Sequence, residues 1–304
     1  MSELQRLVWA GTLNLKIKLD PELVLTELKV KDQEEDRTTN STYVNVQVPR
    51  DSYLILFLPH IIQKLGKQLR MNVRDYYQGW WFEMENVCIP WNFPIGALYD
   101  SFTGLNPKTR ACESRENSIN VWNLVLRYGK QLPRGFIPIR NGSEQIRELW
   151  MHQWKQACFV MNGNSKLVMS FSKRDTLSFW ESVLCRSQTS FASFSDIRQR
   201  ILPVDGKVKS VPVKIHLALP DIRLVEPVCS AYDNEREVEL SEVLAREFPE
   251  WFASDGKSHN LAVPVIQGIL VPLEVPLWKL YQQLASFDGF LHISLCLVAD
   301  SDAP

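Results

Sequence analysis

The 304-residue sequence lacks the long apolar runs that mark membrane-spanning and exported proteins. A spanning helix needs about 20 apolar residues, and the longest apolar stretch here, Tyr53 to Pro59, is far shorter. The first 18 residues show no continuous apolar core of the kind that a secretory signal contains. We therefore expect a cytoplasmic protein without a spanning segment.

Metal-binding and catalytic motifs are also missing. The six cysteines are scattered, with no Cys-x-x-Cys pair and no histidine spaced to complete a zinc site, so we expect reduced thiols. There is no Gly-x-Ser-x-Gly motif, glycine-rich phosphate loop or His-Glu-x-x-His zinc helix. These absences predict no catalytic residue, no metal and no cofactor. A cysteine hydrolase assembled between domains stays open, because residues distant in sequence can meet in space.

The sequence carries no excess charge of one sign. Lys and Arg number 34 against 35 Asp and Glu, a net charge of -1, which argues against a nucleic-acid binder because such proteins need a basic field. The balance hides two local biases. Residues 143–210 hold ten basic and six acidic side chains, whereas residues 221–257 hold four basic and ten acidic ones. Segments of opposite sign suit a platform that binds several partners.

Alternation of apolar and polar residues predicts strands at 13–19 and 44–48. Apolar residues recur every three or four positions from 54 to 69, which predicts a helix, and Pro59 is expected to kink it. Two further strands are expected at 80–84 and 122–128. Strands around one helix predict a compact α+β unit.

The middle of the sequence, 143–200, has helical spacing, and Ser143 is the expected N-cap of its first helix. After residue 207 the strand pattern returns, with strands expected at 211–219 and 222–228, a short helix near 240–248, and a last strand at 290–298. The order strand, strand, helix, strand therefore occurs twice.

An internal repeat supports this duplication. Residues 89–99 align without gaps to residues 271–281, so that both prolines, the apolar residue after the second proline and a Leu-Tyr pair coincide. Each copy is predicted to be a short strand, a proline-bounded turn and a short helix, as precedes the last strand of ubiquitin-like β-grasp domains. The predicted fold is α+β, with an N-terminal segment (1–10), a first ubiquitin-like domain (11–130), a helix-rich domain (143–205) and a second ubiquitin-like domain (208–304).

The first helix of the middle region places one lysine apart from its apolar face. On a helical wheel, Lys155 lies roughly 140° from the centre of the apolar stripe. Glu148 and His152 lie on the same polar side. Lys155 is therefore expected to be exposed on a rigid helix, although spacing alone favours an ordinary solvated lysine on a polar face. The apolar stripe consists of Ile146, Trp150, Trp154, Ala157, Cys158 and Met161.

Distinctive short segments occur around this helix and along the rest of the chain: LVWAG (7–11), PRDSYL (49–54), WFE (81–83), PWNFPIG (90–96), HQWKQACF (152–159), NGNSK (162–166), FW (179–180), QGI (267–269) and SFDGFLHI (286–293). In these segments the sequence resembles the autophagy protein 5 family in its fungal form, and the similarity extends over nearly the whole chain. A mild departure is Cys88, where a proline is common.

The resemblance implies a non-catalytic scaffold in autophagosome formation. The lysine that matches Lys155 accepts the C-terminal glycine of the ubiquitin-like autophagy protein 12 in an isopeptide bond, after activation by autophagy protein 7 and transfer by autophagy protein 10. The conjugate binds the coiled-coil autophagy protein 16. It then acts as a ligase that promotes transfer of autophagy protein 8 from its conjugating enzyme, autophagy protein 3, to phosphatidylethanolamine. A non-covalent ubiquitin-like adaptor is the alternative.

The acceptor chemistry and the membrane contact add three expectations. The attacking amine must be neutral, and a free lysine amine has a pKa near 10.4, so the conjugating enzyme is expected to deprotonate Lys155, with His152 as a candidate helper. Lys166, Lys173 and Arg174 are candidate contacts to an anionic membrane, although a merely solvated basic face is the favoured explanation from sequence. The resemblance implies a cytoplasmic, peripheral protein at the preautophagosomal structure.

Overall fold

The computed structural model describes residues 2–25, 42–104, 120–203, 208–219, 221–252 and 261–298. Contacts group the chain into two compact units. Unit 1 takes in Met1–Gly11, Gly96–Ser118 and Trp150–Pro304, and unit 2 takes in Thr12–Ile95 and Ile119–Leu149. This grouping follows spatial contact, and the domain limits expected from the sequence stay a prediction.

Unit 2 contains a five-stranded sheet formed by β1 (Thr12–Leu19), β2 (Tyr43–Pro49), β3 (Trp80–Met84), β4 (Val87–Ile89) and β5 (Val121–Tyr128). The strand order is β2-β1-β5-β3-β4. The central β1 and β5 run parallel and the other neighbours are antiparallel. This is the mixed sheet expected of a ubiquitin-like fold.

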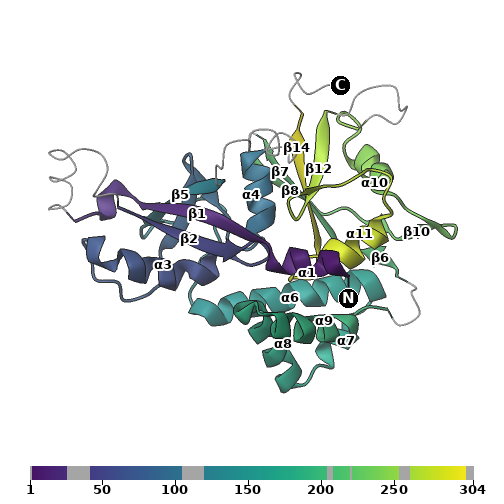
Figure 1. The fold of residues 1–304 in the computed structure, drawn as a ribbon, viewed down its shortest axis with the longest axis horizontal. Helices are drawn as coiled ribbons and strands as arrows, with labels where there is room; N and C mark the ends of the chain where they lie inside the picture. The colour runs from purple at the N-terminus through teal and green to yellow at the C-terminus, as the bar shows by residue number, and fades with distance from the viewer. Residues whose placement is uncertain are drawn as a thin grey trace. The chain divides into compact units, whose positions relative to one another are not determined.

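The alternation in β1 places its leucine and isoleucine side chains in the core, because successive side chains of a strand point to opposite faces. Helix α3 (Leu58–Leu65) contacts β2 and lies against the β1 and β2 strands in Figure 1. It follows the 3-10 turn η2 (Leu54–Phe57) and precedes η3 (Gly66–Gln68). The predicted kink at Pro59 is wrong, because this proline stands in the first turn of α3, where its missing N–H is not needed.

Unit 1 contains a second five-stranded sheet formed by β7 (Val213–Leu219), β8 (Asp221–Val225), β12 (Ala262–Ile266), β13 (Ile269–Leu270) and β14 (Leu291–Leu297). Its order is β13-β12-β14-β7-β8, with β7 and β14 parallel at the centre. Read from its other edge, this order repeats that of unit 2. The chain therefore holds two ubiquitin-like sheets, as expected.

The repeated proline turns are also alike in space. In each copy the second proline forms a β-bridge with the residue that precedes a helical segment, Pro94 with Tyr53 and Pro276 with Glu239. In both copies the residue after that proline donates its N–H at 2.8 Å to the carbonyl of the residue before the bridge. Each copy consists of a short strand, this turn and a helix, as expected: β4 leads to α4 (Ile95–Thr103), and β13 leads to α11 (Leu277–Leu284).

The helix-rich region consists of α6 (Gly142–Asn162), α7 (Lys166–Met169), α8 (Lys173–Cys185) and α9 (Gln188–Gln199). In Figure 1, α8 and α9 lie side by side, and their rings pack on α6. The remaining described elements are α1 (Glu3–Ala10), η1 (Pro21–Leu23), β6 (Ser210–Val211), β9 (Cys229–Ser230), β10 (Tyr232–Asp233), β11 (Arg236–Glu237) and α10 (Leu240–Glu247).

The start of α6 differs from the prediction. The helix begins at Gly142, so Ser143 lies within its first turn and is not the N-cap. The side chain of Gln145 instead ties the helix to the segment before it, because its Oε1 accepts the backbone N–H of Arg140 at 2.8 Å and of Asn141 at 3.4 Å. Among the described residues, no helix has the length and apolar character needed to cross a bilayer.

The central strands of the second sheet are buried on both faces. One face of β14 carries apolar residues and contacts α11. The opposite face carries polar residues that are equally buried, among them His292 and Ser294. Ser294 Oγ donates to the carbonyl of Ala97 on α4 at 3.0 Å, and Ser101 of α4 donates to Ser294. The expected last strand at 290–298 is present as β14, and its polar face belongs to a buried polar layer.

Candidate functional site

Lys155 lies on α6 at a pocket with a cavity volume of about 550 Å³. Its side chain is half-buried, so the expected full exposure is wrong in degree, because the pocket walls cover part of the stem. The wall is largely apolar, and Phe159 and Val228 stand out from it as exposed side chains. Residues that line the pocket beside Lys155 include His152, Val160, Lys209, Val211, Glu226 and Phe290.

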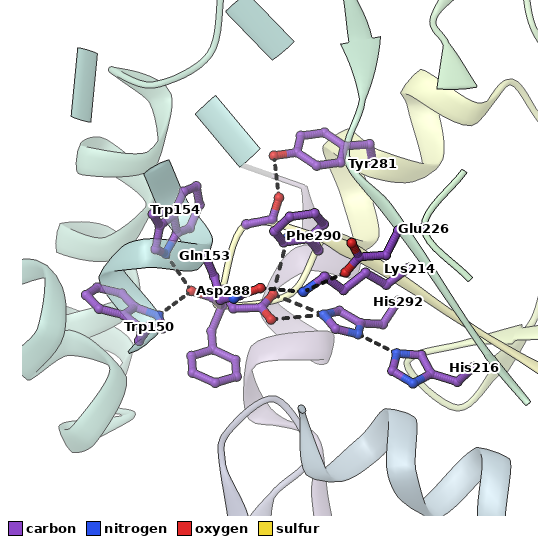
Figure 2. A network of polar contacts seen from close by, with 12 residues as sticks. Trp150, Gln153, Trp154, Lys214, His216, Glu226, Tyr281, Asp288, Phe290 and His292 are labelled. Carbon is purple, nitrogen blue, oxygen red and sulfur yellow. Dashed lines mark hydrogen bonds and ion pairs between the residues drawn. The ribbon is translucent and has the colours of Figure 1, made fainter. Parts of the chain in front are cut away.

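Two buried tryptophans hold the other side of α6. Trp150 and Trp154 are 0% exposed, and both indole Nε1 groups donate to the backbone carbonyl of Phe287 at 2.8 Å. Figure 2 shows the two indoles converging on this one oxygen. Gly289, in the same turn, has a φ of +89°, and a Cβ there would lie 2.8 Å from the Trp154 ring. The turn 286–290 therefore fits closely against α6 and fixes the helix that carries Lys155.

A buried ammonium adds a second attachment to α6. The Lys214 side chain, on β7, is 4% exposed, and it donates to Gln153 Oε1, two residues before Lys155. Its Nζ lies 3.5 Å from Glu226 Oε1 and 4.0 Å from the centre of the Phe290 ring. Figure 2 shows Lys214 between these groups. Because a buried charge needs partners, this arrangement ties α6 to the sheet at a defined place.

A chain of three buried side chains continues the polar layer. His216 Nε2 lies 2.7 Å from His292 Nδ1, and His292 Nε2 lies 3.0 Å from Asp288 Oδ2. Burial, followed by His292 and Lys214, lowers the pKa of His216 well below its ordinary value. Burial alone raises the pKa of Asp288, but His292 and Lys214 outweigh it and leave that pKa lowered. The carboxylate thus stays ionised and holds the turn 286–290 from within.

The structure places the predicted site residues in two groups. His152 is exposed and lines the same pocket as Lys155. Lys166, at the start of α7, and Lys173 and Arg174, at the start of α8, are exposed and are not among the residues that line this pocket. The candidate acceptor lysine therefore lies at the pocket, whereas the candidate membrane-contact residues lie outside its lining.

Sequence reasoning missed the polar layer of Lys214, His216, Asp288 and His292. A signal was present, since Lys214 and His216 interrupt the apolar pattern of a strand at alternate positions. The alternation predicts a strand but does not show what covers its polar side. Only the packing of α4 and α6 residues on this face reveals that it is buried.

Two described cysteines, Cys88 and Cys229, do not resemble activated nucleophiles. Burial, with Glu83 adding to it, raises the pKa of Cys88 to about 12, and burial raises that of Cys229 to about 11. A thiolate nucleophile needs the opposite shift. Cys158 is buried in α6, and its thiol donates to the carbonyl of Asn164. Within the described ranges no group of three His, Cys, Asp or Glu side chains is placed to hold a metal ion.

Comparison with protein families now connects this geometry to known proteins. Three family models match in order: Autophagy protein ATG5, UblA domain, at residues 8–128; its alpha-helical bundle region at 143–204; and its UblB domain at 210–295. Autophagy protein 5 of Eremothecium gossypii is 39% identical over 97% of this chain and 96% of its own length. The chain belongs to the autophagy protein 5 family. It therefore has a role in autophagy, with two ubiquitin-like domains around a helical bundle.

Other autophagy protein 5 relatives agree over the same length. Autophagy protein 5 of Vanderwaltozyma polyspora is 37% identical over 99% of this chain and 98% of its own. The crystal structure of Kluyveromyces marxianus Atg5 matches with a TM-score of 0.78 at 32% identity, and covers 97% of this chain and 99% of that one. The resemblance inferred from the sequence is thereby confirmed.

Proposed function

We propose that this chain is the acceptor of the ubiquitin-like autophagy protein 12 and that Lys155 forms the isopeptide bond. The observation that carries the proposal is the position of Lys155 beside an open pocket, on a helix fixed from behind by Trp150 and Trp154. An acceptor amine must be reachable and yet held still while it attacks, since a defined approach removes much of the entropic cost. Family membership adds support.

The reaction needs a neutral amine at Lys155. The amine nitrogen attacks the glycine carbonyl of the donor thioester, the C–N bond forms, the C–S bond breaks, the thiolate leaves and the amine loses a proton. Autophagy protein 7 activates the donor, and autophagy protein 10 carries it. A free lysine amine is protonated at neutral pH, so the conjugating enzyme supplies deprotonation and desolvation on docking. His152, exposed on the same wall of the pocket, is a candidate helper when neutral.

The conjugate then works as an assembly. It binds the coiled-coil autophagy protein 16 and promotes transfer of autophagy protein 8 from autophagy protein 3 to phosphatidylethanolamine. The chain itself is a non-catalytic scaffold in this scheme. The raised thiol pKa values of Cys88 and Cys229 favour that assignment over a cysteine hydrolase.

Membrane contact belongs to a different surface. Lys166, Lys173 and Arg174 are exposed near one another in sequence on α7 and α8, and each basic residue close to an anionic bilayer adds about 1 kcal/mol. These side chains are proposed to bring a cytoplasmic protein to the surface of the preautophagosomal structure as a peripheral component.

The deciding experiment is reconstitution with Lys155→Arg and, as a matched control, Lys166→Arg. Purified autophagy proteins 7, 10 and 12 should convert the wild type and the control to a band shifted by the mass of autophagy protein 12, and should leave Lys155→Arg unshifted. Autophagy protein 16 should bind all three equally. A shifted band from Lys155→Arg contradicts the acceptor assignment. Full stimulation of autophagy protein 8 lipidation by Lys155→Arg would instead favour the non-covalent adaptor, and loss of stimulation on thiol alkylation would favour the hydrolase.

A further inference from the structure

Unit 2 contains a recess that is distinct from the pocket beside Lys155 and has no part in the proposed acceptor reaction. Its cavity volume is about 710 Å³, and it lies between the segments 71–79 and 128–140. The first segment is the turn that leads into β3, and the second follows the end of β5. Both lie entirely within unit 2.

Three basic side chains line this recess. Arg74, Lys130 and Arg140 are exposed, and none of them forms an ion pair with another described residue. Among the described lining residues Asp75 supplies the only carboxylate, and its Oδ1 already accepts the N–H groups of Tyr77 at 2.7 Å and Gln78 at 2.9 Å. Three cations against one carboxylate give these described residues an excess of two positive charges.

The wall on the side of 71–79 is held in place. Gly129 donates its N–H to the carbonyl of Gly79 at 2.9 Å, and Trp80 Nε1 donates to the carbonyl of Asp75 at 3.1 Å. Gly79 has a φ of +83°, and a Cβ there would lie 2.9 Å from the Tyr128 ring. These contacts fix the turn that carries Arg74.

The opposite wall is fixed by side chains that bind the backbone. Gln145 Nε2 donates to the carbonyl of Pro138 at 2.8 Å, and its Oε1 accepts the N–H of Arg140. Trp91 Nε1 donates to the carbonyl of Ile137 at 2.8 Å. Both walls are therefore ordered without a ligand, which lowers the entropic cost of binding one.

The lining also contains apolar surface. Met71, Val73 and Leu132 are half-buried in it, and Ile139 is buried. A site with apolar contacts and surrounding cations matches a ligand that carries carboxylates and apolar side chains together.

From this arrangement we infer that the recess binds an acidic peptide segment of a protein partner. The carboxylates of the peptide pair with Arg74, Lys130 and Arg140, and an apolar side chain of the peptide packs on the apolar lining residues. A peptide fits better than a bilayer, because the cations surround a concave cavity and a membrane surface cannot enter one. The recess is separate in sequence from Lys155 and from the basic residues of α7 and α8.

Selection from a random peptide display library against the full chain tests the inference. Enriched peptides should combine at least two acidic residues with an apolar one. Fluorescence anisotropy should show binding to the wild type that weakens with added salt, because the contacts are ionic. Arg74→Glu with Arg140→Glu should weaken binding at least about tenfold, whereas Lys64→Glu with Lys67→Glu, an equal charge change at exposed sites in α3 and η3, should leave it unchanged.

Thermal unfolding of both double variants ensures that a loss of binding does not come from unfolding. The inference is overturned if no acidic peptides are enriched, or if those enriched bind the Arg74 and Arg140 variant as well as the wild type. It is also overturned if this variant retains peptide binding but loses sedimentation with phosphatidylserine vesicles, since the recess would then serve the membrane.

Discussion

At residue 289 the backbone adopts a φ of +89°, and a Cβ would meet the Trp154 ring at 2.8 Å and the Cβ of Ala157 at 3.0 Å. Gly289→Ala should therefore lower the free energy of unfolding by about 2–4 kcal/mol, from backbone strain and overpacking together. Urea unfolding measures this loss. Gly66→Ala is the matched control, because its φ is -55° and no heavy atom lies within 4 Å, so stability should stay equal or rise slightly. Equal losses in both variants would contradict the proposed fit.

The buried His216 predicts a pH dependence of stability. Its pKa is lowered by burial and then by His292 and Lys214, so below about pH 6.5 the unfolded chain binds a proton that the folded chain does not. The free energy of unfolding should therefore fall as the pH drops from about 6.5 towards the lowered pKa, by up to about 1.4 kcal/mol per pH unit for one group. Urea unfolding at pH values of about 7.5, 6.5 and 5.5 tests this.

Matched histidine variants identify the group. His216→Gln keeps a donor near His292 and should flatten the dependence, whereas His152→Gln, at an exposed position, should leave it unchanged. Asp288 acts at lower pH, since its lowered pKa gives stability that is present above its ordinary value of about 4 and lost as the pH falls through the folded pKa. An unaltered slope in His216→Gln would show that another group is responsible.

Individual residues show what the sequence can and cannot reveal. Helical spacing predicted that Trp150 and Trp154 face the core and that Lys155 faces away. Spacing could not predict that Lys214 and His216 are buried, because the partners that cover them come from other parts of the chain.

At the scale of elements, α6 is joined to the turn 286–290 through the backbone carbonyl oxygen of Phe287, which accepts hydrogen bonds from two indoles of α6. Each of Trp150→Phe and Trp154→Phe should cost about 1 kcal/mol, because the other indole still binds the Phe287 carbonyl. The double variant should cost more than the sum of the two, because the buried carbonyl then loses both donors. A double-mutant cycle by urea unfolding measures the coupling. Strictly additive losses would mean that the shared oxygen does not link the two side chains.

Two prolines lie where the predicted elements differ from the fold. Strand β12 contains Pro264, and no strand is predicted there from the sequence. Its carbonyl accepts from Val271 on the β13 side, so its missing N–H also faces that side, beyond the paired residues of β13. Pro59 is expected from the sequence to kink a helix, but it lies in the first turn of α3. In both places the effect of the proline depends on where the element begins and on which neighbouring strand its missing N–H faces, and the local sequence shows neither.

For the whole molecule, the near-zero net charge conceals opposite local fields. Sedimentation with phosphatidylserine vesicles should weaken as salt rises, and Lys173→Glu with Arg174→Glu should reduce the bound fraction severalfold. Lys64→Glu with Lys67→Glu makes the same charge change at exposed sites elsewhere and should leave binding nearly intact. If the two double variants lose binding equally, total charge governs binding, and the α8 residues have no special part.

The contact between α6 and the turn 286–290 has a consequence for biosynthesis. Phe287 follows Trp154 by 133 residues, so at about 5–20 residues per second the ribosome needs roughly 7–27 seconds to deliver the carbonyl that both indoles bind. During that interval the rings of α8 and α9 can already pack on α6, but both indole N–H groups still lack their acceptor, and the surface that the turn 286–290 covers is open to chaperones and to aggregation. The nascent helix that presents Lys155 gains this last part of its support only when the second ubiquitin-like sheet forms.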